Sequence, residues 1–174
     1  MISLEAFDAW ADERLEQLRG NPTADAVFTA ASHLGDFSLI WHIVGTARGA
    51  TSNRRADQAV VFAVLLGAES LLVNQGIKRL FRRTRPTTSG DERFVVRTPS
   101  TSSFPSGHAS AAFFAATLLT TWGGARTAPL WFGLAGIVGS SRAYVRIHHA
   151  SDVVGGAVVG LALGQAATSA LRRR

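Results

Sequence analysis

The stretch SRAYVRIHHASD, residues 141–152, holds cations, two imidazoles and a carboxylate between two long apolar segments. On a helix or a helix-like turn, residues three and four positions apart share a face. Asp152 can therefore reach His148 or His149 and orient one ring nitrogen while the other faces a substrate. Arg142 adds a planar fork of donors that suits phosphate oxygens. These residue types predict a phosphate-handling nucleophile.

The apolar segments around this stretch predict helices that cross a membrane. A helix needs about 20 predominantly apolar residues to span a bilayer, and a water-soluble helix would instead show a polar stripe. Residues 109–122, 128–141 and 153–171 carry no charge, and residues 59–77 carry a single one, at Glu69. We therefore expect a polytopic membrane protein. The alternative is a soluble helical protein whose helices are buried.

The composition narrows the partners of the chain. At 174 residues one domain is expected, and a formal net charge of +6 indicates an anionic partner: nucleic acid, lipid headgroups or a phosphorylated substrate. The sequence has no Cys, which excludes disulfides and thiolate metal sites. The first residues, MISLE, lack the basic and apolar regions of a cleavable signal peptide, so none is expected.

The order of segments predicts an all-α fold: a polytopic bundle of about five transmembrane helices after an N-terminal amphipathic helix. Apolar residues recur at helical spacing in residues 3–19, which is typical of a helix lying in the membrane interface. Gly20 to Pro22 ends it, and Thr23 is a candidate N-cap for the next helix. The expected spans cover residues 24–47, 59–77, 105–122, 129–144 and 151–171, the last capped by Ser151.

This order defines a single membrane-embedded domain, residues 1–174, with the amphipathic helix in residues 1–22 and the bundle in residues 23–174. Residues 87–103 form a long polar loop, and loops of that length are usually functional. Five spans place the region 78–108, the stretch 142–152 and the N-terminal helix on one membrane face.

The opposite face would then carry Arg48, Arg54, Arg55, Arg126 and the terminal arginines. By the positive-inside rule that face is cytoplasmic, although the site's own face is basic too. We therefore expect a plasma-membrane protein with an extracytoplasmic site.

Three motifs stand in order along the chain: Lys78-x6-Arg85-Pro86, Pro105-Ser106-Gly107-His108 and Ser141-Arg142-x5-His148-x3-Asp152. They resemble the three-part signature of the type-2 phosphatidate phosphatase superfamily. That superfamily includes lipid phosphate phosphatases, bacterial polyprenyl-diphosphate and phosphatidylglycerophosphate phosphatases, soluble acid phosphatases and vanadium haloperoxidases. The motifs span residues 78–152, close to half the chain, and three in order are far more specific than one.

The resemblance implies a role for each matching residue. His148 is the expected nucleophile, forming a phosphohistidine, with Asp152 holding its far nitrogen. His108 is the expected general acid that protonates the leaving oxygen. No cofactor and no metal are implied. The residues expected to bind the phosphoryl oxygens are Lys78, Arg85, Ser106, the backbone N–H of Gly107, and Arg142.

Taken singly, these residues have simpler explanations. Segment 78–85 alone is typical of a juxtamembrane basic patch attracted to anionic lipid. His149 is expected to be structural; choosing His148 as the nucleophile depends mainly on the family spacing. Tyr144 is expected to anchor the chain at the membrane interface. The arginines assigned to the basic patch are Arg79, Arg82 and Arg83.

Three ionisable residues fall within the expected spans, where such groups are functional candidates. At about 1.5 Å per residue from the active face, His33 and Glu69 lie at similar depth, with Asp36 deeper. We expect a contact between His33 and Glu69 that fastens the first two helices or, alternatively, meets the substrate head.

The apolar surface around a phosphate site indicates a lipid-borne phosphate, held at the bilayer, as the partner, and no nucleic acid. The resemblance allows phosphatidate, phosphatidylglycerophosphate and polyprenyl mono- or diphosphates. The small size, the five spans and SHLGDFS at residues 32–38 are similar to the branch that acts on decaprenyl-phosphoryl 5-phosphoribose. Two alternatives are vanadium-haloperoxidase-like oxidation and a non-catalytic basic protein that binds anions with steep salt dependence.

Overall fold

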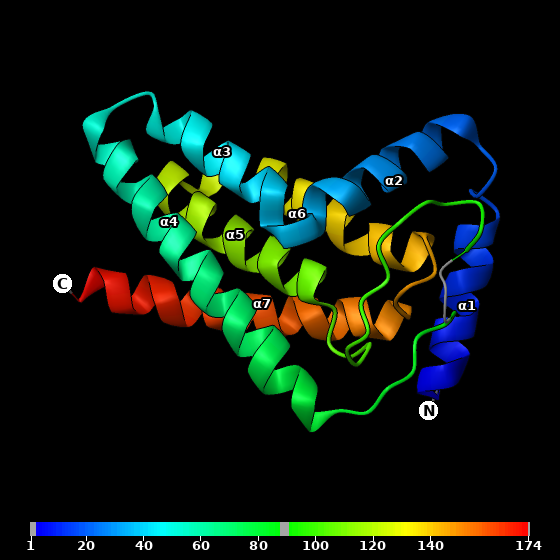
Figure 1. The fold of residues 1–174 in the computed structure, drawn as a ribbon. Helices are drawn as coiled ribbons and strands as arrows, with labels where there is room; N and C mark the ends of the chain where they lie inside the picture. Colours follow the sequence, from blue (N-terminus) through cyan, green and yellow to red (C-terminus); the bar gives the residue numbers. More distant parts are fainter. Residues whose placement is uncertain (1–2, 88–90, 174) are drawn as a thin grey trace.

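The computed structural model describes residues 3–87 and 91–173, and within them the regular elements are all helical. The prediction of an all-α chain is confirmed. Met1, Ile2, Arg174 and residues 88–90 of the expected loop lie outside the described residues. The helices are α1 Leu4–Glu16, α2 Pro22–Gly35, α3 Leu39–Gly49, α4 Asn53–Leu71, α5 Gly107–Gly123, α6 Ala128–Tyr144 and α7 Ala150–Arg172 (Figure 1).

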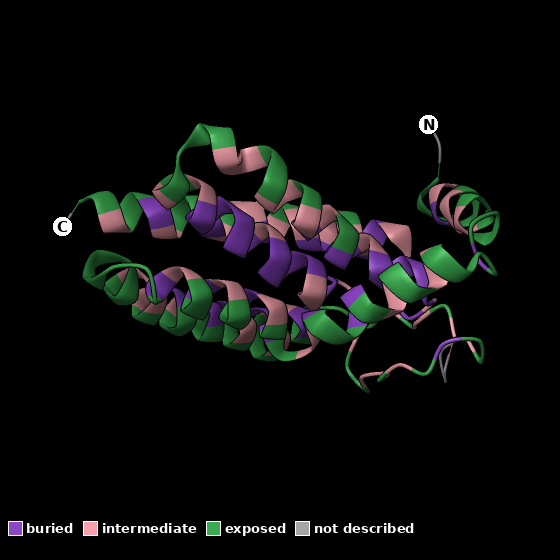
Figure 2. Cartoon of the chain, turned by 90° about the horizontal axis from the view of Figure 1, so that it is seen from above, coloured by how far each residue is buried: buried purple, intermediate pink, exposed green. Residues whose placement is uncertain are grey.

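Helix α5 is the buried centre of the bundle and packs most extensively on α7 and α6. Its close approach to α7 depends on glycines of α7 spaced four residues apart, which bring the two backbones together. A Cβ added at Gly156 would lie 2.4 Å from the Ser106 carbonyl oxygen, and one at Gly160 would lie 2.1 Å from the Ser110 carbonyl oxygen. Figure 2 shows the buried residues running along the middle of the molecule.

The expected first span, residues 24–47, is two helices and not one. Between α2 and α3 the chain makes a 3-10 turn, Asp36–Ser38, in which Phe37 has φ 52° and Ser38 has φ 59°. Two consecutive non-glycine residues in the left-handed region break the helix, although the apolar pattern runs through it. Helix α2 also begins earlier than predicted, since Asn21 and not Thr23 is its N-cap.

Helix α1 lies across one end of the bundle, against α6 and α7 (Figure 1). Its acidic residues Asp8, Asp12 and Glu16, spaced four apart, form ion pairs with arginines from other parts of that end, whereas Leu4 and Trp10 are exposed. The acidic stripe therefore helps to hold α1 in place, together with Leu15, which packs against the cluster around Tyr144.

Tyr144 at the end of α6 is buried, so its predicted role as an interface anchor is wrong. Its hydroxyl donates to the Leu18 carbonyl oxygen at 3.0 Å or to Asp25 Oδ1 at 2.6 Å, and its ring stacks on Phe28. Tyr144 thus joins the α1–α2 connection to the end of α6.

Among the described residues, two helices are long and apolar enough to cross a membrane: Asn53–Leu80, which extends α4, and Ala150–Arg172. Only 22% of the apolar window of each is buried, so each helix also has apolar side chains that the bundle does not cover. In Figure 2 the outer faces of the helices are largely exposed. Apolar residues on those faces include Val60, Val64, Leu71, Val154 and Val158.

Candidate active site

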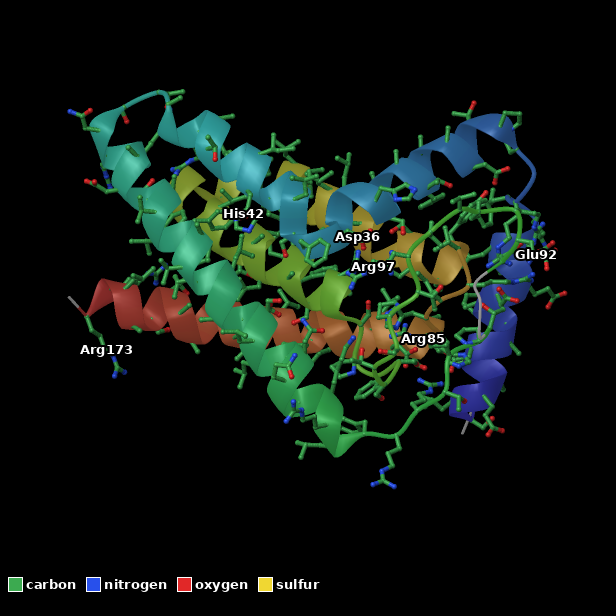
Figure 3. The ribbon with its side chains drawn as sticks, viewed as in Figure 1. Asp36, His42, Arg85, Glu92, Arg97 and Arg173 are labelled. Carbon is green, nitrogen blue, oxygen red and sulfur yellow. The ribbon has the colours of Figure 1, made fainter. Side chains whose placement is uncertain are left out.

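The three predicted motifs converge at one end of the bundle, where residues 81–87 and 91–106 lie beside the ends of α5, α6 and α7. Figure 3 shows Asp36, Arg97 and Arg85 at this end, with Arg173 at the far end. A cavity of about 330 Å³ opens there, lined by Asp36, Asn74, Lys78, Arg97, His108 and His148 among others.

His148 lies in the turn between α6 and α7 and is 3% exposed. Its Nδ1 is 3.5 Å from Asp152 Oδ2, a distance that gives electrostatic contact without a formed hydrogen bond. Asp152 Oδ2 also accepts from the backbone N–H of His149 at 2.8 Å and from Ser103 Oγ at 2.5 Å. The carboxylate therefore faces the ring of His148, whereas from His149 it accepts a hydrogen bond of the backbone N–H.

The electrostatic surroundings keep the His148 ring neutral. Burial lowers the pKa of His148 to about 3; the carboxylate of Asp152 opposes this shift, and the cations Arg85, Lys78 and Arg142 add to it. A neutral imidazole keeps a free lone pair on one nitrogen at ordinary pH. His148 Nε2, the nitrogen away from Asp152, is 3.1 Å from Arg85 Nη1.

Arg85 is held in a cage of backbone carbonyls. Its Nη1 donates to the Ile147 oxygen at 2.7 Å, its Nε to Pro99 at 2.9 Å, and its Nη2 to Thr101 at 3.0 Å. Burial lowers the pKa of Arg85, but a guanidinium stays charged at any ordinary pH. The cage thus presents a fixed positive charge beside His148.

Arg142 on α6 is completely buried and is only partly compensated. Its Nη1 donates to Ser32 Oγ at 2.5 Å and lies 3.9 Å from Asp36 Oδ1, while its Nε has no hydrogen-bond partner in the described part of the chain. A buried cation with an unpartnered donor suits an anion, but the lining of the cavity includes neither Arg142 nor Arg85. Lys78, 5% exposed, lines the same cavity.

His108 stands in the first turn of α5, behind the N-cap Ser106, whose Oγ accepts from the Ala109 N–H at 3.4 Å. His108 Nε2 is 3.1 Å from Asp36 Oδ1, without the alignment of a full hydrogen bond. Gly35 leaves room for the ring, since a Cβ there would lie 2.5 Å from His108 Cδ2. The second imidazole therefore also has a carboxylate beside it. Ser106 and Gly107 begin α5 at the same end, as predicted.

A sequence profile of the PAP2 superfamily matches residues 58–174, more than half of the chain. The chain belongs to the PAP2 superfamily. The predicted family is thus confirmed, since PAP2 is the type-2 phosphatidate phosphatase superfamily.

Two mycobacterial phosphatases are similar in sequence to this PAP2 chain over most of its length. Decaprenylphosphoryl-5-phosphoribose phosphatase of Mycolicibacterium smegmatis is 36% identical over 142 residues, which are 80% of this chain and 74% of that protein. The enzyme of the same name from Mycobacterium tuberculosis H37Rv is 35% identical over 137 residues, 76% of this chain and 72% of the relative.

Two solved structures have the same fold. The transmembrane PAP2 type phosphatidylglycerolphosphate phosphatase of Bacillus subtilis superposes with a TM-score of 0.70 and 25% identity, covering 95% of this chain and 86% of that one. LpxE of Aquifex aeolicus also gives a TM-score of 0.70, at 23% identity, covering 92% and 94%. The chain thus has the fold of PAP2 membrane phosphatases.

Two residues that sequence reasoning did not select lie directly behind the PAP2 motifs. Arg83, assigned above to a lipid-binding patch, instead donates to Asp152 Oδ1 at 2.7 Å and to Asp8 Oδ2 at 2.6 Å. Asp8 of α1 in turn accepts from the Ser151 backbone N–H at 2.8 Å. The N-cap of α7 is His149 and not Ser151 as predicted. A row of similar arginines offers no sequence signal that singles out Arg83.

The expected contact between His33 and Glu69 is wrong. Glu69 is buried and accepts a hydrogen bond from Ser110 of α5, whereas His33 is exposed on α2. Asp36 is not deeper in the bundle than the site, because the break after α2 places it beside His108. The predicted depth of Asp36 assumed one unbroken helix from residue 24 to residue 47, but α2 ends at Gly35.

Proposed function

We propose that this PAP2 protein is an integral-membrane lipid phosphatase that hydrolyses a phosphomonoester or diphosphate through a phosphohistidine intermediate, without a metal. The observation that carries the proposal is the cavity lined by both His148 and His108, each with its own carboxylate, with Lys78 in its wall. This set of groups supplies a nucleophile, an acid and positive charge around one phosphate.

In the first step, Nε2 of the neutral His148 attacks phosphorus and the P–O bond to the lipid breaks. The leaving oxygen takes a proton from His108, so the alcohol departs neutral and the phosphoryl group stays on His148. In the second step a water attacks the phosphohistidine, gives its proton to His108 and releases inorganic phosphate. Both histidines return to their starting states.

The charges around the cavity suit this reaction. Asp152 stabilises the positive charge that develops on the His148 ring when its Nε2 forms the bond to phosphorus. Arg85, next to that nitrogen, and Arg142, with its unpartnered Nε, bind the equatorial oxygens together with Lys78. The Ser106 hydroxyl and the Gly107 N–H add donors at the N-terminus of α5, where the helix dipole favours an anion.

Asp36 is the partner of the acid. Its carboxylate beside His108 orients the ring and favours the protonated form that must give up a proton to the leaving group. Asp36 also lies near the guanidinium of Arg142 and so offsets part of its charge. Asp36 is thus a positioning residue that acts through His108.

We place the single domain across the plasma membrane. The broken pair α2–α3 and the helices α4, α5, α6 and α7 make five crossings, with α1 at the interface. The outward apolar faces of α4 and α7 support this arrangement, and α5 and α6, at 17 residues each, meet the lower limit of about 17 for a span. The positive-inside rule favours an extracytoplasmic site.

The substrate that we propose is a polyprenyl-phosphoryl phosphoribose, the substrate class in the names of the mycobacterial relatives. Such a lipid carries a phosphodiester beside the phosphate to be removed. Arg97 is exposed at the cavity, with its guanidinium 4.8 Å from the ring centre of Phe37, itself 80% exposed. This pair suits a second negative charge and the adjoining sugar.

The test is phosphate release by the purified protein in detergent, measured on a panel of phosphatidate, phosphatidylglycerophosphate, polyprenyl phosphate and polyprenyl-phosphoryl 5-phosphoribose. We expect release in the presence of a chelator, inhibition by vanadate, and the highest kcat/KM on the phosphoribose lipid. A requirement for a divalent metal, or failure of vanadate to inhibit, would contradict the mechanism. A preference for phosphatidate would contradict only the substrate.

A further inference from the structure

A second cavity is lined by residues of the α3–α4 connection and of the adjoining ends of α5 and α6. These elements meet at the end of the bundle opposite α1 (Figure 1). Its volume is about 690 Å³. We call it the arginine cavity, because its lining includes Arg48, Arg54, Arg55, Gln58, Trp122 and Trp131. None of these residues belongs to the catalytic cavity.

The three arginines of this cavity carry uncompensated charge. At the other end of the molecule the arginines around α1 are paired with carboxylates, as in Arg93 with Glu16. Among the described residues no such ion pair forms in the arginine cavity. Like charges held together favour an anion that screens their repulsion.

Neutral groups orient two of the guanidiniums. Arg48 Nη1 donates to Gln58 Oε1 at 2.6 Å, and Arg55 Nη1 donates to Thr51 Oγ1 at 2.8 Å. The Arg48 guanidinium also lies 5.7 Å from the ring centre of Trp122. These contacts hold the forks in place and leave other N–H donors of each guanidinium available for a bidentate contact with an oxyanion.

We propose that the arginine cavity binds the phosphate of an anionic phospholipid. Half-buried tryptophans are typical of the membrane interface, and basic pockets between helices at that level bind anionic headgroups. Leu130, next to Trp131, is exposed and offers apolar surface to an acyl chain. The choice of a phospholipid as the ligand rests on the membrane arrangement of the proposed function, but does not depend on the phosphatase activity.

The test compares lipid binding to the full chain in neutral detergent by native mass spectrometry, with phosphatidylglycerol and phosphatidylcholine as probes. The double variant Arg54→Gln/Arg55→Gln removes two cations of the cavity. The matched control, Arg126→Gln/Arg173→Gln, removes two arginines that do not line it. We expect the cavity variant to bind phosphatidylglycerol about 10- to 30-fold more weakly, and the control to bind like the unmodified protein.

Each remaining outcome argues against the proposal. Equal losses in the two double variants mean that the lipid responds to overall charge and not to this cavity. Equal binding of phosphatidylcholine means that the cavity does not select an anion. Displacement of phosphatidylglycerol by millimolar inorganic phosphate or glycerol 1-phosphate identifies a soluble phosphate as the ligand. Phosphate release by the same variants shows that they are folded. If the unmodified protein itself releases no phosphate, the proposed phosphatase function fails, but the comparison of lipid binding still tests the arginine cavity.

Discussion

Replacing Asp36 by Asn is the most informative test of how the two histidines divide their work. The change removes the charge of a carboxylate that lies 3.1 Å from His108 Nε2, and it keeps the size of the side chain. A hydrogen bond to a charged group contributes about 1.5–3 kcal/mol when well formed. Since this pair lacks full alignment, the lower value applies, and about 1.4 kcal/mol corresponds to a tenfold loss in rate.

The assay measures kcat/KM, which covers the steps up to release of the leaving group, on two kinds of phosphate ester. An alkyl or sugar phosphate needs a proton on its leaving oxygen, whereas p-nitrophenolate leaves without one. We expect Asp36→Asn to lower kcat/KM about tenfold on the alkyl ester, and to leave the p-nitrophenyl ester almost unaffected. The exposed Asp57→Asn serves as the control and should change neither.

A double-mutant cycle decides whether Asp36 acts through the acid. In a His108→Ala background, Asp36→Asn should have almost no further effect, because the group it orients is gone. Equal losses on both esters, or losses that add independently in the double variant, would refute the assignment. The first result would point to an effect on Arg142 and substrate binding instead.

Further predictions concern other parts of the molecule. His148→Ala should abolish phosphate release, whereas His149→Ala should keep much of it; similar losses would undo the choice of nucleophile. The folded protein holds the pKa of His148 below its unfolded value, so the unfolded state binds more protons between about pH 6.5 and pH 3. Its thermal midpoint in detergent should therefore fall as the pH drops through this range, less steeply in His148→Gln. Arg83→Gln removes two ion pairs at the site and should lower kcat at least about tenfold, while Arg82→Gln should match the unmodified enzyme in phosphate release. Gly160→Ala places a methyl group 2.1 Å from a carbonyl oxygen of α5, and its unfolding midpoint in detergent should drop by several degrees; an unchanged midpoint would show that α7 can shift.

The helices around α5 could be predicted well because their signals are local. Ser106 begins α5 as a cap, and the charge-free segments 109–122 and 128–141 coincide with α5 and α6. Motif spacing also brought Asp152 to His148, because Asp152 lies in the first turn of α7 and His148 just before that helix begins. These features depend on neighbours in sequence.

The break between α2 and α3 was not predicted, because its sequence signal, Gly35 followed by Asp36, stands inside an apolar pattern that continues on both sides. The two residues with positive φ, Phe37 and Ser38, are neither Pro nor Gly. Residues of that type adopt such angles when the surrounding structure requires them. The consequence is a site carboxylate, Asp36, that a continuous helix would have carried away from His108.

Helix α1 was predicted as a helix, but its role was not. An apolar stripe predicts a helix at the membrane interface. Asp8, Asp12 and Glu16 lie one turn apart along α1. Arg19, just after the helix, is a local partner of Asp12 and Glu16. Their other partners, Arg83, Arg93 and Arg146, come from far along the chain, so those pairings have no local signature.

Arg83 connects α1 to His148, the proposed nucleophile, through a short chain of charges. One end of its guanidinium holds Asp152, the carboxylate behind His148, and the other holds Asp8. Because Asp8 also accepts the Ser151 N–H at the start of α7, the helix that carries Asp152 is fixed from both sides. A carboxylate with this many partners has little freedom to rotate. The N-terminal helix therefore contributes to the orientation of Asp152 beside His148, although none of its residues belongs to the three motifs.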